Sequence, residues 1–313
     1  MKWERRTKLT YVKMAILTSL LLTFLSNSSR TSSISAKKYL IITATDGYDI
    51  IVLTGFMRSL RNVFLGDVIV LISESVEPST SMKKLAKALH FSYQPVPRLT
   101  RHGLRTDRYF GYAIACTDRY AGCFAADVRD VRFQTDPFKD AEYKKDLVLS
   151  LEDARVKFGP TSLQKCSKTV QDNCFCPYNH KWIESCWGTT FVESLNELTP
   201  ICSGTIQGTP AGFIQLHREM EKLLTFTSEN NNCTARDQGH LNYLYYSGTL
   251  DRNAISVEKR GSGIVNTVGY MTTESVAGII VGGQIRNDDG QLSPVIHQYD
   301  RFPALKKKID APN

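Results

Sequence analysis

Two acidic residues at the end of an apolar run are the residues of this chain best suited to chemistry. The run 122–126 predicts a buried strand, and Asp127 and Asp130 follow it directly. In open α/β sheets, ligands bind at the carboxyl ends of the strands. Paired carboxylates at such an edge suit Mg²⁺ or Mn²⁺, ions that keep coordination positions for substrate phosphates. The alternative is a surface loop in which Arg129 pairs with a neighbouring acid.

The elements that must position this acidic pair alternate between strand and helix. Further strands are expected at 39–45, 67–73, 91–96 and 147–150, and helices at 50–60, 82–89, 105–120 and 214–226. This alternation predicts βαβ units, and therefore an α/β fold with a largely parallel sheet. A cysteine-rich stretch then interrupts the pattern, and the glycine-rich tail predicts short strands and loops.

The first 38 residues carry most of the positive charge. They hold eight Lys and Arg residues and one acid, a net +7, which leaves +1 of the chain's formal +8 for the rest. A near-neutral body lacks the broad basic surface that binds nucleic-acid phosphates. Nucleic acid is therefore not an expected partner.

The basic residues run into an apolar segment, so the N-terminus predicts targeting to a membrane. We expect a cytosolic tail at 1–13, a signal anchor at 14–25 and a Ser/Thr-rich stem at 26–37. A cleaved signal peptide is the alternative. An anchor would make a single-pass type II membrane protein whose body, 38–313, lies in the Golgi or ER lumen. A cleaved signal would allow secretion.

Cysteine usage agrees with such a compartment. Six of the eight cysteines fall between residues 166 and 233: Cys166, Cys174, Cys176, Cys186, Cys202 and Cys233. In an oxidising lumen this predicts a disulfide-stapled insertion at about 160–235, although the pairing is not readable. A zinc site of Cys174, Cys176 and His180 is the alternative, but its spacing departs from the usual ligand pattern. Asn232 opens an N-glycosylation sequon.

Four short blocks occur in a defined order along the body: Asp127-Val128-Arg129-Asp130, Cys202-Ser203-Gly204-Thr205, Asp237-Gln238-Gly239-His240-Leu241-Asn242 and Val295-Ile296-His297-Gln298. Their order resembles that of GT-A-fold glycosyltransferases, especially the glycogenin-like and galactomannan-galactosyltransferase-like families. The resemblance covers about residues 38–303. It implies a GT-A (Rossmann-like) nucleotide-diphospho-sugar transferase fold. The implied activity is sugar transfer, with retention, from a nucleoside-diphosphate sugar to a glycan, glycoprotein or glycolipid hydroxyl.

The resemblance also implies a metal site. In such enzymes the strand-end acids and a late histidine hold a divalent ion that bridges the donor's diphosphate. Here the candidates are Asp127, Asp130 and His297, with Mn²⁺ or Mg²⁺ as the cofactor. Arg129 stands where the second acid is expected, so either Asp130 is the ligand or Arg129 partly replaces the metal by its charge. A hydrogen-bonded structural histidine is the alternative reading of His297.

Other roles follow from the same resemblance. Asp237, expected to cap a helix, and Asn242 on its next turn would be the catalytic pair beside the reacting carbon. The expected donor contacts are Thr43 and Asp46 at the ribose, Arg108 (and Arg105) at a phosphate or sugar, and the backbone of Ser203 and Gly204. Glycine would allow the donor a close approach, whereas an ordinary turn is the alternative for that segment. A non-catalytic glycan- or protein-binding protein of the same fold is the alternative function.

Overall fold

The structure is a computed structural model, and it describes residues 38–45, 47–100, 103–139, 143–160, 162–228 and 232–310. The expected tail, anchor and stem at 1–37 lie outside the described residues, and so does Asp46. No helix in the described ranges is both long enough and apolar enough to cross a membrane.

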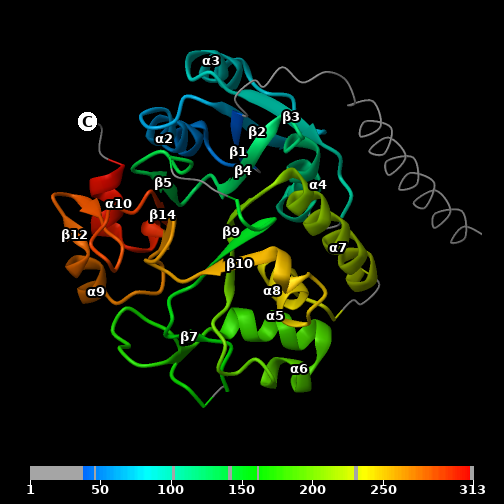
Figure 1. The fold of residues 1–313 in the computed structure, drawn as a ribbon, viewed down its shortest axis with the longest axis vertical. Coiled ribbons are helices and arrows are strands. Elements are labelled where there is room, and N and C mark those ends of the chain that lie inside the picture. The colour runs from blue at the N-terminus through cyan, green and yellow to red at the C-terminus, as the bar shows by residue number, and fades with distance from the viewer. Residues whose placement is uncertain are drawn as a thin grey trace, which may run out of the picture. The chain divides into compact units, whose positions relative to one another are not determined.

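A seven-stranded sheet forms the centre of the molecule, in the order β10-β6-β9-β4-β1-β2-β3 (Figure 1). Its strands are β1 Lys38–Ala44, β2 Asp67–Ser73, β3 Ser92–Val96, β4 Tyr120–Asp127, β6 Leu147–Leu151, β9 Ile201–Gly208 and β10 Ile255–Glu258. All of them run parallel except β9, which is antiparallel to both β4 and β6. The predicted α/β class and the mostly parallel sheet are confirmed. The near-continuous apolar runs of β1 and β2 fit strands that are buried on both faces.

Helices cover both faces of this sheet. They are α2 Ile50–Arg61, α3 Thr80–Ala88, α4 Leu104–Ala115 and α7 Pro210–Ser228. The buried side of α2 (Leu53, Phe56, Met57 and Leu60) packs in one cluster with Ile41, Val70 and Phe124 of the sheet. On the other face α4 lies so close that a Cβ on Gly111 would be 2.5 Å from Leu71 Cδ1. Successive residues of a strand point to opposite faces, so Val70 packs on the side of α2 and Leu71 packs against α4.

The helix expected at 105–120 is shorter than predicted, because it ends at Ala115. The backbone N–H of Cys116 closes its last turn on Tyr112 O, and the Cys116 side chain is joined by a disulfide to Cys123 on β4. The chain must turn here to begin β4 at Tyr120. This local disulfide lies outside the cysteine-rich stretch and was not expected from the sequence.

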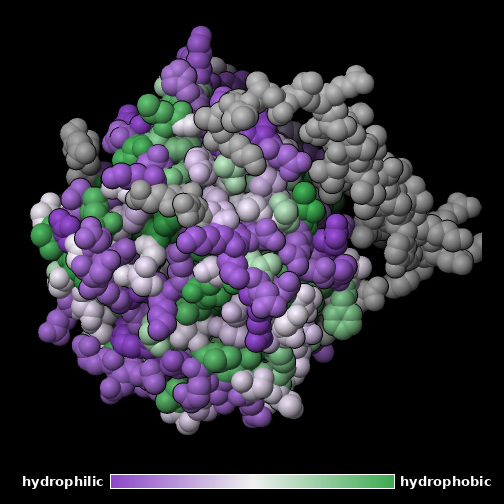
Figure 2. All heavy atoms as spheres, in the orientation of Figure 1, coloured by the Kyte–Doolittle hydropathy of each residue, from purple (hydrophilic) through white to green (hydrophobic). Residues whose placement is uncertain are grey.

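A small second sheet, in the order β11-β14-β5, brings the C-terminal region back beside β4. It consists of β5 Val131–Phe133, β11 Val265–Thr267 and β14 Val295–His297. A second core of Val268, Ile296, Tyr299 and Leu305 packs behind it. The surrounding elements are short, as predicted: η1 Arg252–Ala254, α9 Thr273–Gly278, β12 Ile280–Val281, β13 Gln284–Ile285, η2 Tyr299–Arg301 and α10 Pro303–Ile309. The surface visible in Figure 2 mixes hydrophilic and hydrophobic residues.

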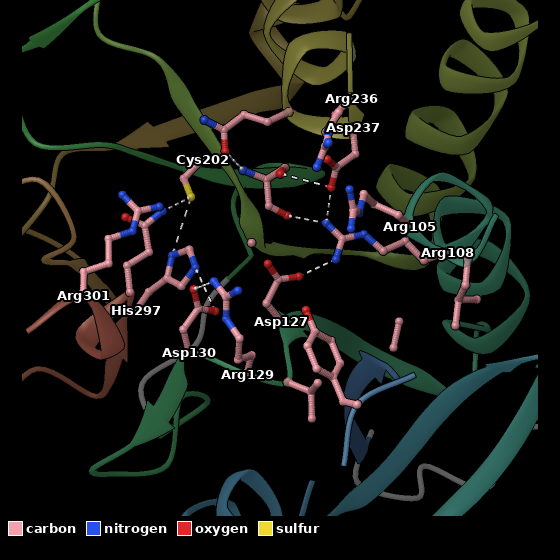
Figure 3. A pocket seen from close by; sticks show the side chains of 18 of the residues that line it. Arg105, Arg108, Asp127, Arg129, Asp130, Cys202, Arg236, Asp237, His297 and Arg301 are labelled. Atoms are coloured by element: carbon pink, nitrogen blue, oxygen red, sulfur yellow. Dashed lines mark hydrogen bonds and ion pairs between the residues drawn. The ribbon is translucent and has the colours of Figure 1, made fainter. Parts of the chain in front are cut away.

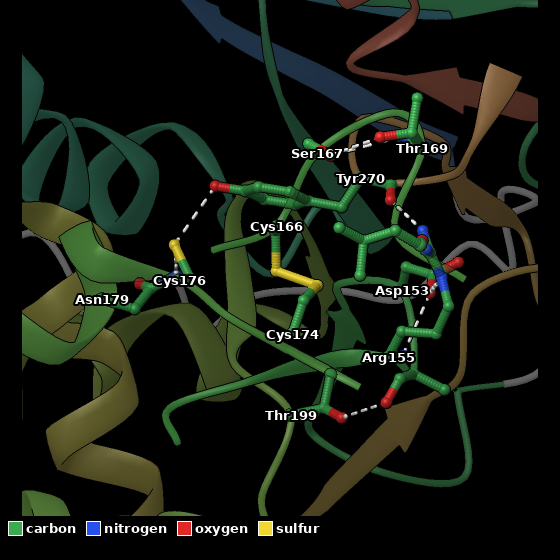
Figure 4. Close-up of a disulfide and its surroundings, with 12 residues drawn as sticks. Asp153, Arg155, Cys166, Ser167, Thr169, Cys174, Cys176, Asn179, Thr199 and Tyr270 are labelled. Carbon is green, nitrogen blue, oxygen red and sulfur yellow. Dashed lines mark hydrogen bonds and ion pairs between the residues drawn. A yellow bond between two sulfur atoms is a disulfide. The ribbon is translucent and has the colours of Figure 1, made fainter. Parts of the chain in front are cut away.

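The cysteine-rich region differs from its prediction. Only four of its six cysteines form disulfides, Cys166–Cys174 (Figure 4) and Cys186–Cys233, while Cys176 and Cys202 are buried free thiols. The zinc alternative is contradicted because the Cys174 sulfur is already bonded in a disulfide. The region is also more than an insertion, since it contains β9 of the main sheet. It also contains α7, β8 Cys174–Phe175, α5 Pro177–Trp187 and α6 Thr189–Glu193, with β7 Val156–Lys157 just before it and α8 Asp237–Tyr246 just after it.

Peptide mapping without reduction tests this arrangement of cysteines. Protein from a secretory expression host should yield three linked peptide pairs, because the Cα atoms of the pairs lie 6.0, 4.8 and 4.4 Å apart, within disulfide range. Cys176 and Cys202, each 1% exposed, should react with an alkylating reagent only after denaturation. A cross-linked peptide containing Cys176 or Cys202 would contradict the structure.

Candidate functional site

A cavity of about 230 Å³ opens at the carboxyl ends of β1 and β4, where Ala44 and Asp127 line it (Figure 3). The chain runs outward through β1, β2 and β3 and then places β4 on the other side of β1. Such a reversal of strand order is where open α/β sheets bind ligands. Nearly half of the lining residues are ionisable: Arg105, Arg108, Arg129, Arg236, Arg301, Asp127, Asp130, Asp237 and His297.

Asp127, Asp130 and His297 meet at one end of this cavity. Each offers one ligand atom, and the three atoms lie within 4.8 Å of one another. The strand register explains the meeting, because β14 pairs with β5 so that His297 lies opposite Val131, the residue after Asp130. The backbone N–H of Gln298 also donates to the Asp130 carbonyl at 2.8 Å. Residues far apart in the sequence are thereby fixed beside each other.

The space beside His297 and Asp127 exists because residue 204 is glycine. Ala126 pairs with Thr205 across β4 and β9, so the next residues, Asp127 and Gly204, approach each other. A Cβ on Gly204 would lie 2.4 Å from His297 Nε2 and 3.0 Å from Asp127 Oδ2. Two carboxylates and an imidazole are a donor set that fits Mn²⁺, with Mg²⁺ less suited to the imidazole. The three residues therefore form a candidate site for a divalent cation.

The side chain of Arg129 does not lie where its charge could take the place of a metal ion among Asp127, Asp130 and His297. It is 51% exposed and lies 3.2 Å from both Asp130 Oδ2 and Asp300 Oδ2, whereas the side chain of Asp130 is only 6% exposed. Of the two alternatives that the sequence leaves open, the geometry favours Asp130 as the ligand. Arg129 lies beside the group as an added positive charge.

Arg108 joins the metal end of the cavity to Asp237. Its Nη1 contacts Asp127 Oδ1, and its Nη2 lies 2.6 Å from Asp237 Oδ2. The guanidinium is buried, with an exposed fraction of 7%. Burial lowers the pKa of Arg108, but Asp127, Tyr112 and Asp237 raise it by more, so the guanidinium stays charged. Burial raises the pKa of Asp127, and Arg108 opposes that rise. Because Arg108 holds Oδ1 of Asp127, Oδ2 is left facing His297.

Asp237 is the first residue of α8, and the cap position belongs to Arg236, so the expected N-cap role is wrong. The carboxylate turns instead to Arg108 and accepts a hydrogen bond from Ser203 Oγ at 3.3 Å. Ser203 and Gly204 lie within β9, which contradicts the turn alternative for that segment. Gln238 Oε1 accepts from the backbone N–H of Ser203 at 3.3 Å and ties the start of α8 to this strand.

Two predicted residues are placed elsewhere. Asn242 is fully buried and does not line the cavity, because its side chain hydrogen bonds to both the N–H and the carbonyl of Ile201, at 2.7 and 2.8 Å. The expectation that Asn242 faces the pocket is therefore wrong, and its amide anchors α8 to β9. Thr43 is also buried and donates its hydroxyl hydrogen bond to Ala126 O at 2.7 Å, away from the lining.

A buried polar layer behind His297 escaped the sequence reasoning. His297 Nδ1 lies 3.5 Å from Cys202 Sγ, and Gln298 Nε2 donates to Cys202 Sγ and to Glu152 Oε1, at 3.5 and 3.3 Å. Burial raises the pKa of the Cys202 thiol well above its ordinary value, so the thiol stays neutral. One residue could have indicated this layer in the sequence: Glu152 is an acid at the end of an apolar strand, as Asp127 is.

The chain matches no family model and no curated protein. Among solved structures it is similar to the glycosyltransferase GlyE of Streptococcus pneumoniae TIGR4, in a crystal structure and in an apo-form structure. Both have 12% sequence identity and a TM-score of 0.47, and the match covers 84% of this chain and 55% of GlyE. The chain thus spans about half the length of GlyE.

Gly204→Ala tests the candidate cation site. The added methyl group would occupy the space beside His297 Nε2 and Asp127 Oδ2, so Mn²⁺ affinity measured by calorimetry should fall by about ten-fold or more. Thr205→Val is the matched control on the same strand, because Thr205 Oγ1 is buried without a hydrogen-bond partner. A folded Gly204→Ala protein with unchanged Mn²⁺ affinity would show that no cation binds there.

Proposed function

We propose that this protein is a GT-A-fold glycosyltransferase that moves a sugar from a nucleoside-diphosphate donor to a hydroxyl of a glycan, glycoprotein or glycolipid. One observation carries the proposal. The cation group of Asp127, Asp130 and His297 is joined through buried Arg108 to a second carboxylate, Asp237, in one cavity at the switch point of the sheet. In a nucleotide sugar, the diphosphate needs a cation beside it, and the attached sugar needs a group such as the Asp237 carboxylate that accepts hydrogen bonds from its hydroxyls.

Asp127, Asp130 and His297 would hold the divalent ion. When bound, the ion supplies positive charge that stabilises the departing nucleoside diphosphate. Arg129 and Arg301 line the same end of the cavity, where their guanidinium groups add to that stabilisation. The cavity is smaller than the roughly 300–1,000 Å³ of sites that enclose a whole drug-sized ligand. It therefore suits the diphosphate and sugar, with the nucleoside extending outward past Ala44.

Asp237 is suited to orientation of a sugar hydroxyl. Its Oδ2 accepts from Arg108 and from Ser203 Oγ, which leaves Oδ1 to accept a hydrogen bond from a hydroxyl. The ion pair with Arg108 holds this carboxylate in a fixed position, and such positioning is itself a large source of catalysis. The contacts of Oδ2 with Arg108 and Ser203 commit this carboxylate to positioning. This supports retention, in which no separate protein base has to activate the acceptor.

We also propose that the body lies in the Golgi or ER lumen, held by the N-terminal segment as a single-pass type II membrane protein. Three disulfides support this, because disulfides persist in oxidising compartments. The exposed sequon residue Asn232 is accessible to glycosylation. Reduced cysteines at all six paired positions in protein from its native source would contradict the lumenal assignment.

Donor hydrolysis and transfer, measured with a panel of nucleotide sugars in the presence of Mn²⁺, test the proposed function. Asp130→Asn and Asp237→Asn should each lower turnover by about a hundred-fold or more, because each removes a charge directed at the reacting groups. Asp118→Asn, an exposed aspartate outside the cavity, should retain full activity.

Two results would contradict the proposed metal site, and a third would contradict the transferase activity itself. Full activity of the Asp130→Asn variant would show that Asp130 is not a metal ligand. Wild-type turnover that survives a chelator unchanged would show that the reaction does not need a metal ion. Tight binding of nucleotide sugars without turnover of any of them would favour the non-catalytic alternative.

A further inference from the structure

The five arginines of the cavity differ in whether a carboxylate neutralises them. Arg108 lies between Asp127 and Asp237, and Arg129 lies between Asp130 and Asp300. Arg301 is stacked on the Tyr270 ring at 4.7 Å and lies in the field of buried Glu152. The side chains of the other two, Arg105 and Arg236, are exposed and form no ion pair with any described residue.

Arg105 and Arg236 lie at the end of the cavity opposite the cation group. Arg105 is one helical turn before Arg108 on α4, and Arg236 directly precedes Asp237 at the start of α8. Figure 3 shows both of them beside Asp237, whereas Asp130, His297 and Arg301 lie at the other end. This inference rests on the proposed function, in which the diphosphate binds at the cation group. The two unpaired arginines therefore face the sugar end.

An aromatic surface adjoins these two cations. Trp182 of α5 lines the cavity. It packs closely on Gly239 in the first turn of α8, where an added Cβ would lie 2.9 Å from the Cβ of Trp182. Tyr178, one turn earlier on α5, is 65% exposed, and the two ring centroids lie 6.1 Å apart. Aromatic rings of this kind combine an apolar face with a polar tip, and the apolar face packs against the C–H face of a sugar ring.

We propose that Arg105, Arg236 and Trp182 bind a sugar residue that carries a carboxylate or sulfate group, so that this transferase acts on an acidic saccharide. The ring packs on Trp182, and the two guanidinium groups pair with the acid group. Guanidinium is the side-chain cation best matched to planar or multi-oxygen anions, because its N–H groups bind two oxygens at once. The acid group belongs either to the transferred sugar or to the acceptor.

Calorimetry with matched ligand pairs distinguishes these two sources. The donor arm compares UDP-glucuronate with UDP-glucose in the presence of Mn²⁺. The acceptor arm adds UDP and Mn²⁺ and compares a chondroitin sulfate tetrasaccharide with the same tetrasaccharide after desulfation and carboxyl reduction. In one arm the acidic ligand should bind about ten-fold or more tightly than the neutral ligand, the scale of one charge-assisted hydrogen bond.

The double variant Arg105→Gln/Arg236→Gln should lose this preference while its affinity for UDP changes by less than about two-fold. Arg58→Gln/Arg218→Gln is the matched control, because it removes the same charge from two exposed arginines outside the cavity. The control should keep the preference, which excludes a general effect of net charge.

Two outcomes would overturn the inference. One is the absence of any acid preference in both arms, and the other is a loss of UDP affinity in the Arg105→Gln/Arg236→Gln variant, which would assign the arginines to the diphosphate. Failure of the proposed function gives a different result. A wild-type protein that binds no nucleotide sugar but still prefers the acidic tetrasaccharide would retain this saccharide site without the transferase activity.

Discussion

Arg108 is buried between two carboxylates that reach it from different parts of the chain, Asp127 at the end of β4 and Asp237 at the start of α8. Removing one partner of a buried ion pair typically destabilises a protein by about 3–5 kcal/mol, because a charge is left without compensation. The helix α4, the strand β4 and the helix α8 are therefore held in a fixed relation at this point. The same contact directs Asp127 Oδ2 toward His297 and fixes the Asp237 carboxylate in the cavity.

The second constraint is the return of the C-terminal region to the edge of β4. The pairing of β14 with β5 places His297 opposite Val131, and no rotation of His297 alone could bring it to Asp130 from another register. Gly204 completes the arrangement from β9, where any side chain would fill the space beside His297 and Asp127. The pairing of strands thus fixes the site, and it includes Asp130 in the short loop between β4 and β5.

The apolar runs of the sequence predicted β1, β2, β3, β4 and β6 and the helices α2, α3, α4 and α7, because burial on one or both faces leaves a period that can be read directly. They did not predict β9 or α5, whose sequences mix polar residues with apolar ones. Asp127 and Asp130 were recognisable since carboxylates at the end of an apolar run have no role in a core. The ion pair of Arg108 with Asp237 was not readable from the sequence, because it depends on how α4 and α8 approach each other in space. The inward direction of Asn242 and the pairing of the cysteines depend on tertiary packing in the same way.

Anomalous diffraction at the manganese edge, from crystals grown with Mn²⁺ and a nucleoside diphosphate, tests the central claim most directly. The account predicts one strong peak within bonding distance of Asp127, Asp130 and His297, with the diphosphate oxygens on its open side and Arg108 still bound to Asp127. A diphosphate bound at the arginines with no peak among these three side chains would contradict it.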